Sequence, residues 1–189
     1  MDFVNPPLAF VVMDGLVAPR LFRSFYRGYA DRIHLAGNEA VLEFGCGSGG
    51  ISEQLACRLP NGSITCVDIS PPMVRIAARR MKKRGNVRCL VGRIESFSLP
   101  EASYDVVVVH NALHDILTEE RVMTAKTLAT LLAPGGRLYF REPTKLSHGF
   151  PVDIYRSLMH DVGLHELSLE EAKRFPIGPV VEAVFEKPS

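Results

Sequence analysis

Several features that would indicate a membrane or secreted protein are missing from this sequence of 189 residues. The apolar stretch from Leu8 to Met13 is far too short to cross a bilayer. It is also too short for the core of a signal peptide, and no basic leader precedes it. We therefore expect a cytoplasmic protein whose contact with a membrane, if it has one, is peripheral.

Cysteine is sparse, and its spacing argues against a metal site. The four thiols are Cys46, Cys57, Cys66 and Cys89. No two of them have the Cys-x-x-Cys spacing of a zinc or redox site. All four fall in a glycine loop or in apolar segments, so we interpret them as buried thiols of a reducing compartment and expect no metal.

The sequence also lacks a net charge of either sign and any mark of a second domain. Its formal charge of +1 at pH 7 argues against a general binder of polyanions. A chain of this length suits one domain with a sizeable core, and 47% hydrophobic residues is ordinary for a globular protein. No internal repeat, low-complexity tract or linker divides it.

What the sequence does contain is a glycine-rich turn between a predicted strand and a predicted helix. The segment from Ala40 to Ser52 reads AVLEFGCGSGGIS. Its apolar start predicts a buried strand. Several glycines follow this strand, just before a predicted helix that begins near Ile51. Glycine tolerates positive φ and lets a ligand lie against the main chain, while the amides of the following helix face that ligand. The turn therefore predicts a binding loop.

An acidic residue at the end of the next predicted strand completes a nucleoside-binding half-site. Asp68 lies 23 residues after Gly45, where a carboxylate can accept hydrogen bonds from both ribose hydroxyls. The loop also matches the dinucleotide motif Gly-x-Gly-x-x-Gly, which is weak evidence on its own. Glu43 argues against that interpretation, because its carboxylate would repel a pyrophosphate. The loop suits a neutral or cationic nucleoside better.

After this loop, alternating patterns predict a parallel sheet with helices on both faces. We expect strands at 40–44, 63–68, 87–91, 104–109 and 136–141, and helices at 50–59, 71–84 and 118–132. Ser70 and Thr118 are the expected N-caps of the last two helices, and the third helix should end at Pro134-Gly135-Gly136. Past Glu142 we expect a helix to about Val162 and then a final hairpin added to the sheet.

The first residues of the chain stand apart from this alternation. We treat residues 1–35 as an N-terminal helical segment on the substrate side, and residues 36–189 as the main domain. A helix expected from Arg20 to His34 carries an aromatic stripe and, on another side, an arginine stripe. We favour packing on the domain with some character of a lid, and an interfacial membrane helix stays open. Tyr26 and Tyr29 on this helix are candidates to line the acceptor site.

Four segments, in order, resemble the motifs of class I S-adenosylmethionine-dependent methyltransferases, of the small-molecule and quinone-biosynthesis type. VLEFGCGSG is similar to the first motif and VDIS to the second. VGRIESFSLPEASYDVVVVHNALHDI resembles the segment with the adenine contact and the fourth strand, and LLAPGGRLYFREP resembles the fifth-strand motif. The resemblance covers roughly residues 36 to 187. It implies a doubly wound α/β fold whose mainly parallel seven-stranded sheet has the order 3-2-1-4-5-7-6, with strand 7 antiparallel.

The resemblance also implies that S-adenosylmethionine is the cofactor. Asp68 would hold the ribose and Ile69 would pack on the adenine, while Glu43 would lie near the methionine moiety. The implied cofactor-binding residues are Glu43, Gly45, Cys46, Gly47, Gly49, Asp68, Ile69, Met73, Arg93, Ile94, His110 and Asn111. Arg93 is a departure, because the family often has an acid there that accepts from the adenine amino group, and arginine only donates. Either Glu95 or a backbone carbonyl accepts from the adenine amino group instead, or the adenine is bound less tightly.

The reaction implied by the resemblance is displacement at a methyl carbon activated by the adjacent sulfonium, with much of the rate coming from orientation in a dry pocket. A general base is needed only if the acceptor enters protonated. Ligands of open α/β sheets bind beyond the carboxyl ends of the strands, which selects the residues after the fourth and fifth strands. These are His110, Asn111, His114, Asp115 and Glu142. His114 is the first candidate for the base and an acceptor contact, because imidazole titrates near neutrality, and Glu142 is the second.

The acceptor class follows partly from a missing motif. The Asp/Asn-Pro-Pro-aromatic signature of many methyltransferases that act on exocyclic or amide nitrogens is absent, and HNAL stands in its place. This absence argues against nucleobase amino groups as acceptors, and the resemblance to small-molecule and quinone-biosynthesis methyltransferases implies a small or amphipathic acceptor.

Two alternatives stay open. Residues 71–88 are strongly basic, and no acid lies between Asp68 and Glu95, which would suit methylation of RNA or of a lipid headgroup. A solvated helix face is the simpler explanation, since no aromatic residues for base stacking are interleaved. The other alternative is a non-catalytic subunit that binds the cofactor.

Overall fold

The computed structural model of this protein describes residues 2–147 and 149–189. Its strands form a seven-stranded sheet of order β3-β2-β1-β4-β5-β7-β6. This confirms the order that the resemblance implied. The chain folds as two compact units, the first ending at Ser96 and the second running from Phe97 to Ser189.

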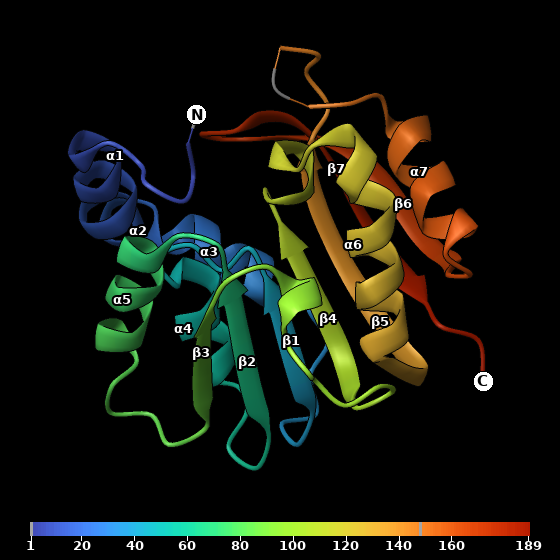
Figure 1. The fold of residues 1–189 in the computed structure, drawn as a ribbon, viewed down its shortest axis with the longest axis horizontal. Coiled ribbons are helices and arrows are strands. Elements are labelled where there is room, and N and C mark those ends of the chain that lie inside the picture. Colours follow the sequence, from blue (N-terminus) through green and yellow to red (C-terminus); the bar gives the residue numbers. More distant parts are fainter. Residues whose placement is uncertain (1, 148) are drawn as a thin grey trace. The chain divides into compact units, whose positions relative to one another are not determined.

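The first unit begins with helices and continues as alternating strands and helices (Figure 1). Its elements are α1 (Leu8–Val12), the π-helical turn η1 (Met13–Val17), α2 (Ala18–Leu21), α3 (Arg23–Ala30), β1 (Ala40–Phe44), α4 (Gly50–Ala56), β2 (Ser63–Asp68), α5 (Pro71–Arg80), β3 (Val87–Val91) and the 3-10 turn η2 (Ile94–Ser96). β2 pairs in parallel with both β1 and β3. Val41, Leu42 and Val67 are completely buried, so the centre of these strands forms the core of the unit.

The second unit is built on β4, β5 and a terminal antiparallel pair. Its elements are β4 (Tyr104–His110), the 3-10 turn η3 (Leu113–Asp115), α6 (Thr118–Leu131), β5 (Leu132–Pro143), α7 (Val152–Asp161), β6 (His165–Arg174) and β7 (Gly178–Glu186). β4 and β5 are parallel, whereas β7 runs antiparallel to both β5 and β6. Figure 1 shows α6 lying across β4 and β5, with α7 beside it. The buried run from Val106 to Val109 makes β4 a central strand, as its continuous apolar sequence predicted.

The five predicted strands, the three predicted helices, the helix after Pro151 and the final hairpin are all present, but the N-terminus differs from the prediction. Helical structure begins at Leu8, well before the expected Arg20, and it ends at Ala30 rather than at His34. The expected single helix is also broken at Phe22, whose φ of −104° and ψ of 29° are not helical. The apolar residues that precede Arg20 are therefore part of the folded N-terminal segment.

Of the two predicted N-cap residues, Ser70 stands at the N-cap position of its helix, whereas Thr118 does not. Ser70 occupies the N-cap position of α5, but its side chain makes no capping bond. Its backbone N–H instead donates to Asp68 Oδ1 at 2.8 Å. Thr118 is the first residue of α6, and Leu117 stands at the N-cap.

Two further predictions need correction. The segment Pro134-Gly135-Gly136 does not terminate a helix, because α6 ends at Leu131 and these residues lie inside β5. Gly135 has φ of 73°, and the register with β4 shifts there, so the segment forms a bulge. The predicted burial of all four thiols holds for Cys46 and Cys66, but Cys57 is exposed and Cys89 is only partly buried.

None of the helices in the described part of the chain has both the length and the apolar character that crossing a bilayer requires. Within the same residues, no cluster of three or more His, Cys, Asp or Glu side chains is arranged to hold a metal ion.

Candidate active site

The glycine loop after β1 is tied to the acid at the end of β2. The Gly47 N–H donates to Asp68 Oδ2 at 2.8 Å, and the other carboxylate oxygen accepts from Ser70. Gly45 and Gly49 have φ of 72° and 80°, a region in which residues with a Cβ are strained. Each carboxylate oxygen has two lone pairs, so Asp68 can shape the loop and still accept from ligand hydroxyls. Sequence reasoning predicted the ligand contact but not the loop-holding role.

Two glycines of this loop have different surroundings. A Cβ atom on Gly47, where φ is 51°, would meet only the Met73 Cε atom, at 4.0 Å. A Cβ on Gly49 would lie 3.1 Å from the Ala77 side chain of α5. Gly49 thus lets the loop pack on α5, whereas Gly47 borders open space. Its backbone is where a ligand has room to approach the main chain.

Glu43 is a buried carboxylate that is incompletely satisfied. The residue is 2% exposed, and its Oε2 atom has no hydrogen-bond partner among the described residues. Burial raises the pKa of Glu43 to about 8, and the negative charge of Asp68 adds to the effect, while the Ser52 hydroxyl opposes it. A cationic ligand group would relieve this unfavourable burial. The pair of carboxylates and the open side of Gly47 fit S-adenosylmethionine, which has ribose hydroxyls and a cationic end.

The remaining predicted cofactor residues of the first unit divide by exposure. Ile69, directly after Asp68, is 37% exposed, so its apolar side chain is free to cover an adenine ring. Cys46, Met73 and Ile94 are at most 5% exposed, and their side chains belong to the core. The Arg93 side chain is 47% exposed, with its Nε atom 3.8 Å from Glu95. Roles of these residues in cofactor binding stay predictions.

The two predicted acceptor-site tyrosines pack into the first unit. Tyr29 is 3% exposed and belongs to the core. The Tyr26 ring lies so close to α4 that a Cβ on Gly50 would come within 3.0 Å of it. Burial raises the pKa of Tyr26 to about 12, and the nearby charge of Asp14 contributes. A direct contact of either tyrosine with an acceptor stays a prediction.

Sequence reasoning missed a connection between the N-terminal segment and the glycine loop. Arg80 Nε donates to the Ser48 carbonyl at 3.0 Å, and Arg80 Nη2 donates to the Gly15 carbonyl at 3.1 Å. The Ser48 hydroxyl in turn donates to the Asp14 carbonyl at 3.1 Å. Gly15 fits closely, because a Cβ there would lie 2.5 Å from the Ile76 side chain. In the sequence, the only feature that pointed to this connection was Gly15, a single glycine among apolar residues.

In the second unit, Glu142 organises the turn after β4. Its Oε1 atom accepts from the backbone N–H groups of Ala112 at 2.7 Å and Leu113 at 3.0 Å. Its Oε2 atom accepts from the His114 N–H at 3.1 Å and lies 2.6 Å from His114 Nδ1. The Glu142 side chain is completely buried. Because its oxygens are occupied in this way, Glu142 is suited to positioning His114 rather than to accepting a proton from a substrate.

The His114 imidazole lies between two carboxylates. Nδ1 faces Glu142, and Nε2 is 3.4 Å from Asp115 Oδ1. Burial opposes the charged imidazole, but the hydrogen bond and charge of Glu142, with the charge of Asp115, outweigh it and raise the pKa of His114. With Glu142 ionised, the proton resides on Nδ1 and Nε2 is left to accept another. This is the arrangement by which a carboxylate orients an imidazole base.

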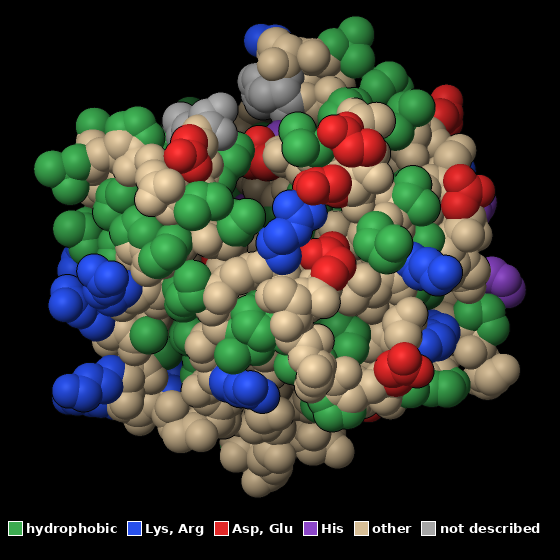
Figure 2. Space-filling model, in the orientation of Figure 1, with side chains coloured by type: hydrophobic (Ala, Val, Ile, Leu, Met, Phe, Trp, Pro, Cys, Tyr) green, Lys and Arg blue, Asp and Glu red, His purple; other side chains and the backbone are tan. Residues whose placement is uncertain are grey.

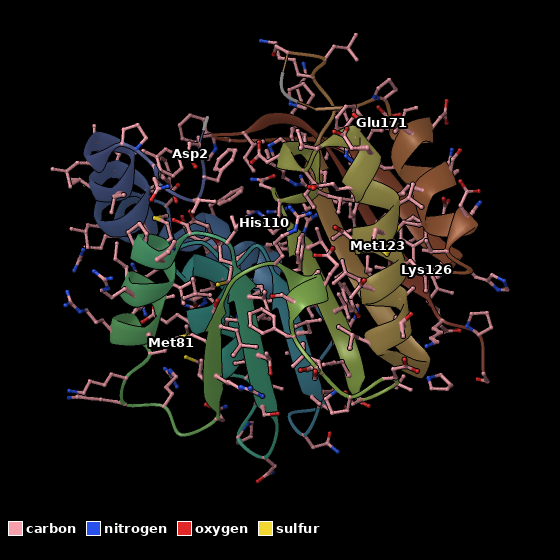
Figure 3. All side chains as sticks on the ribbon, in the orientation of Figure 1. Asp2, Met81, His110, Met123, Lys126 and Glu171 are labelled. Atoms are coloured by element: carbon pink, nitrogen blue, oxygen red, sulfur yellow. The ribbon has the colours of Figure 1, made fainter. Side chains whose placement is uncertain are left out.

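The residues between β4 and this turn behave differently. His110, labelled at the end of β4 in Figure 3, has its pKa lowered to about 3 by burial and by the charge of Arg141. It is therefore a neutral imidazole near pH 7 and a poor base. Asn111 has φ of 52° and donates its N–H to the Arg141 carbonyl at 2.9 Å. Its Oδ1 atom is buried without a partner among the described residues, so it has capacity to accept from a ligand.

Packing of aromatic and cationic side chains supports the same turn. Arg121 Nη2 donates to the Ile116 carbonyl at 2.6 Å, and its guanidinium carbon lies 4.1 Å from the centre of the Phe150 ring. The Tyr155 hydroxyl donates to the Pro143 carbonyl at 3.0 Å. Burial raises the pKa of Tyr155, and the charge of Glu142 adds to this. The turn carrying His114 is thus held by buried groups on several elements.

Comparison with known proteins gives both family and fold. Residues 41–136 match the family model described as a methyltransferase domain. An uncharacterized methyltransferase of Mycobacterium tuberculosis is 36% identical over 113 residues, which are 60% of this chain and 55% of the relative. A demethylmenaquinone methyltransferase of Thermus thermophilus is 29% identical over 119 residues, which are 61% of this chain and 53% of that protein. The chain spans about half the length of the curated relatives it matches.

A solved structure agrees with the fold over nearly the whole chain. The N-methyltransferase NodS from Bradyrhizobium japonicum WM9, in complex with S-adenosyl-L-homocysteine, aligns with a TM-score of 0.74 at 21% identity, covering 94% of this chain and 91% of NodS. The predicted fold class and the resemblance are confirmed, and S-adenosylmethionine is the cofactor of this fold. The glycine loop held by Asp68, the sheet order and the match over residues 41–136 lead to one conclusion: the chain belongs to the methyltransferase-domain family.

Proposed function

We propose that this protein transfers the methyl group of S-adenosylmethionine to a small or amphipathic acceptor that enters protonated, with His114 as the base. The observation that carries the proposal is the Glu142–His114 pair, at 2.6 Å, in a chain of the methyltransferase-domain family. A buried carboxylate that orients an imidazole gives this chain a positioned base. An acceptor hydroxyl, thiol or ammonium would need one.

The first unit supplies the groups that would hold the cofactor. When bound, S-adenosylmethionine supplies a methyl group activated by an adjacent sulfonium. Asp68 accepts from the ribose hydroxyls and keeps the loop in shape through the Gly47 N–H. The unpaired Oε2 of Glu43 would attract the cationic end of the cofactor, and the open backbone at Gly47 would leave room for it.

The second unit supplies the groups that would act on the acceptor. His114 Nε2 takes the acceptor proton, and Glu142 stabilises the imidazolium that forms and fixes which nitrogen is free. Asp115, 3.4 Å from Nε2, adds to the stabilisation of that charge. Glu142, the second candidate base in the sequence, has a positioning role in this scheme. Asn111 is retained as a ligand contact through its unpaired Oδ1.

We propose that residues 1–35 act as a lid for the cofactor side of the first unit; residue 1 lies outside the described residues. Support comes from the bonds that join Asp14 and Gly15 to Ser48 of the glycine loop and to Arg80. Removing water from the reacting groups would strengthen each electrostatic contact within the site. This role accounts for why a short N-terminal segment is attached so specifically to the loop.

Among possible partners, we propose a small-molecule acceptor rather than nucleic acid. One relative acts on demethylmenaquinone by its name, which agrees with an amphipathic acceptor. The exposed basic residues of α5 and the following turn carry no interleaved aromatic side chains for base stacking. We also propose the cytoplasm as the compartment, supported by four cysteines without the spacing of paired thiols.

The proposal is tested by methyl transfer from labelled S-adenosylmethionine to a panel of small phenols, thiols, amines, quinol precursors and total RNA. Transfer to a small acceptor that falls at least about 10²-fold in His114→Gln, with unchanged S-adenosylhomocysteine affinity, is the expected result. Transfer to RNA alone, or binding of the cofactor with no transfer to any acceptor, would refute it. Wild-type turnover by His114→Gln would remove His114 from the mechanism.

A further inference from the structure

The outer side of the N-terminal helices carries an unusual concentration of exposed aliphatic side chains. Sixteen large hydrophobic residues are exposed in the described part of the chain, and seven of them lie between Val4 and Leu21. These seven, called the N-terminal apolar face below, are Val4, Leu8, Val12, Met13, Leu16, Val17 and Leu21. Leu8 is 77% exposed and Leu21 is 69% exposed. Isolated exposed leucines are ordinary, but a group of this size indicates an interaction surface.

The spacing of these residues makes the face continuous. Leu8, Val12 and Leu16 are each four residues apart, as are Met13, Val17 and Leu21. On a helix, residues four apart are neighbours, so the two sets form adjacent rows along α1, η1 and α2. Figure 2 shows apolar side chains gathered over α1 and α2.

The opposite side of the same helices is already occupied. Gly15 and Pro19 are buried, and the Gly15 and Asp14 carbonyls accept bonds from Arg80 and Ser48. Gly15 also contacts Ile76 of α5 closely. The segment is therefore anchored to the first unit in a defined orientation, and its apolar face is the side left over. In the aromatic stripe of α3, by contrast, Tyr29 is buried and Phe22, Phe25 and Tyr26 are only partly exposed.

Cationic side chains border the apolar face. Arg20 is exposed within the segment, and its Nη1 donates to the Leu16 carbonyl at 2.7 Å. On α5, the exposed Arg75 and Arg79 flank Ile76, the residue that contacts Gly15. No acid occurs between Asp68 and Glu95. Figure 2 shows Lys and Arg side chains gathered along the edge that adjoins the apolar residues of α1 and α2.

We propose that the N-terminal apolar face docks on a membrane surface that carries anionic headgroups. Aliphatic side chains would enter the boundary between headgroups and acyl chains, and Arg20, Arg75 and Arg79 would meet the lipid phosphates. A symmetric contact with a second copy of this chain fits less well, because it would bring the arginines of the two copies together. Docking does not depend on the proposed methyl transfer, and the two are tested separately.

Docking would have a consequence for the choice of acceptor. The segment that lies on the lipid is the same one that is bonded to the glycine loop through Ser48 and Arg80. An amphipathic acceptor dissolved in the bilayer would thus meet the protein at its N-terminal segment. This consequence, unlike docking itself, rests on the proposed function.

The test measures co-sedimentation of the full-length protein with vesicles of phosphatidylglycerol and, separately, of phosphatidylcholine. The expected result is binding to phosphatidylglycerol that weakens as salt is raised, and weak binding to phosphatidylcholine. The double variant Leu8→Gln/Leu21→Gln should lose at least about tenfold in vesicle affinity. Its matched control, Leu146→Gln/Leu167→Gln, changes two other exposed leucines, at 76% and 50% exposure, and should bind as wild type.

A second pair of variants tests the cationic border. Arg20→Gln/Arg75→Gln/Arg79→Gln should weaken binding to phosphatidylglycerol and reduce its salt dependence. Lys126→Gln/Lys145→Gln/Lys173→Gln removes three other exposed charges and should have little effect. Binding of S-adenosylhomocysteine and the melting temperature report whether each variant is folded.

Several outcomes would overturn the proposal. They are no binding of the wild type to phosphatidylglycerol vesicles, and equal losses in the variants and their controls. Light scattering provides a further one, because a dimer that dissociates in Leu8→Gln/Leu21→Gln would assign the N-terminal apolar face to self-association instead.

Discussion

At the scale of single residues, His114 is held by groups that determine its protonation. Glu142 accepts from its Nδ1 and from three backbone N–H groups of the same turn, so the imidazole cannot rotate without breaking a buried network. The hydrogen bond and charge of Glu142 raise the pKa of His114 against the effect of burial. The neighbouring His110 has the opposite shift, to about 3. Environment alone thus shifts the pKa values of the two histidines in opposite directions.

A pH dependence of the rate follows from this environment. His114 must be neutral to accept a proton, so kcat should rise with pH as the imidazole loses its proton, at a pH above its ordinary pKa. In Glu142→Gln the partner charge is gone while burial remains, so the rise should move to lower pH and the maximal rate should fall. The measurement is the pH profile of kcat for the two proteins. A profile that does not move would show that Glu142 does not set the protonation of His114.

The same shift predicts how the pair affects stability. The raised pKa means that the folded state binds the His114 proton more tightly than the unfolded chain does. The stabilisation from the charged pair is therefore fully present below the unfolded pKa and is lost as pH rises through the folded pKa. Denaturant unfolding of wild type and His114→Gln should differ more at acidic pH, below the ordinary histidine pKa, than at alkaline pH. An equal difference at both would contradict the ion pair.

Asp68 offers a second prediction at the residue scale. Asp68→Ala should weaken S-adenosylhomocysteine binding by about 1.5–3 kcal/mol, the range for hydrogen bonds to a charged group, as measured by calorimetry. Asp68→Asn keeps one side-chain oxygen as acceptor and should lose less. The loop bond from Gly47 is lost in the alanine variant, so both ribose binding and loop order contribute. Unchanged affinity in Asp68→Ala would exclude Asp68 from the cofactor site.

At the scale of elements, Arg80 joins α5, the glycine loop and the N-terminal segment. Its forked guanidinium reaches the carbonyls of Ser48 and Gly15 together, which a single-donor side chain would not reproduce. Both acceptors are backbone atoms, and the Arg80 guanidinium also lies 3.6 Å from Glu53 of α4. The position of the N-terminal segment against the loop therefore involves one residue of α5.

Replacing Arg80 tests this connection. Arg80→Gln should destabilise the closed position of residues 8–21 by roughly 1–2 kcal/mol, the net worth of about two hydrogen bonds. Hydrogen exchange of the amides in α1, η1 and α2 should become faster, and S-adenosylhomocysteine affinity should fall several-fold. Arg79→Gln, at an exposed position of the same helix, is the control and should leave exchange unchanged. Equal exchange in all three proteins would exclude Arg80 as a latch.

At the scale of the whole molecule, the N-terminal segment has two different sides. One side is bonded to the glycine loop, and the other presents the N-terminal apolar face. A segment that was only core packing would bury its aliphatic residues and expose polar ones. The observed distribution favours a covering element with a second contact outside the domain.

Deletion of residues 2–18 tests the covering role. The shortened chain should keep native circular dichroism and one cooperative unfolding transition, because β1 to β7 and α3 to α7 remain. Its acceptor KM should rise, kcat should fall and cofactor binding should loosen, since the site would admit water. If the deletion unfolds the domain outright, the segment is plain core packing and the lid proposal is wrong.

The sequence by itself determined the local elements and the cofactor half-site. Apolar runs bounded by glycines and prolines placed the strands within a few residues, because burial of a strand leaves a pattern in adjacent positions. The glycine loop and Asp68 were recognisable for the same reason, since positive φ and a strand-end acid are local requirements. The sheet order came from the resemblance of four motifs rather than from any pattern in the residues.

The tertiary structure decided the pairings between distant positions. His114 and Glu142 are 28 residues apart, and Gly15 and Arg80 are 65 apart. No local periodicity records such contacts, because they depend on how strands and helices are brought together after each has formed. For the same reason the sequence placed Glu142 among the bases, and it left both packing on the domain and a membrane contact open for the aromatic stripe. Folding buried the Glu142 carboxylate against four N–H groups and buried Tyr29 of the aromatic stripe, while aliphatic residues such as Leu8 and Leu21 stayed at the surface.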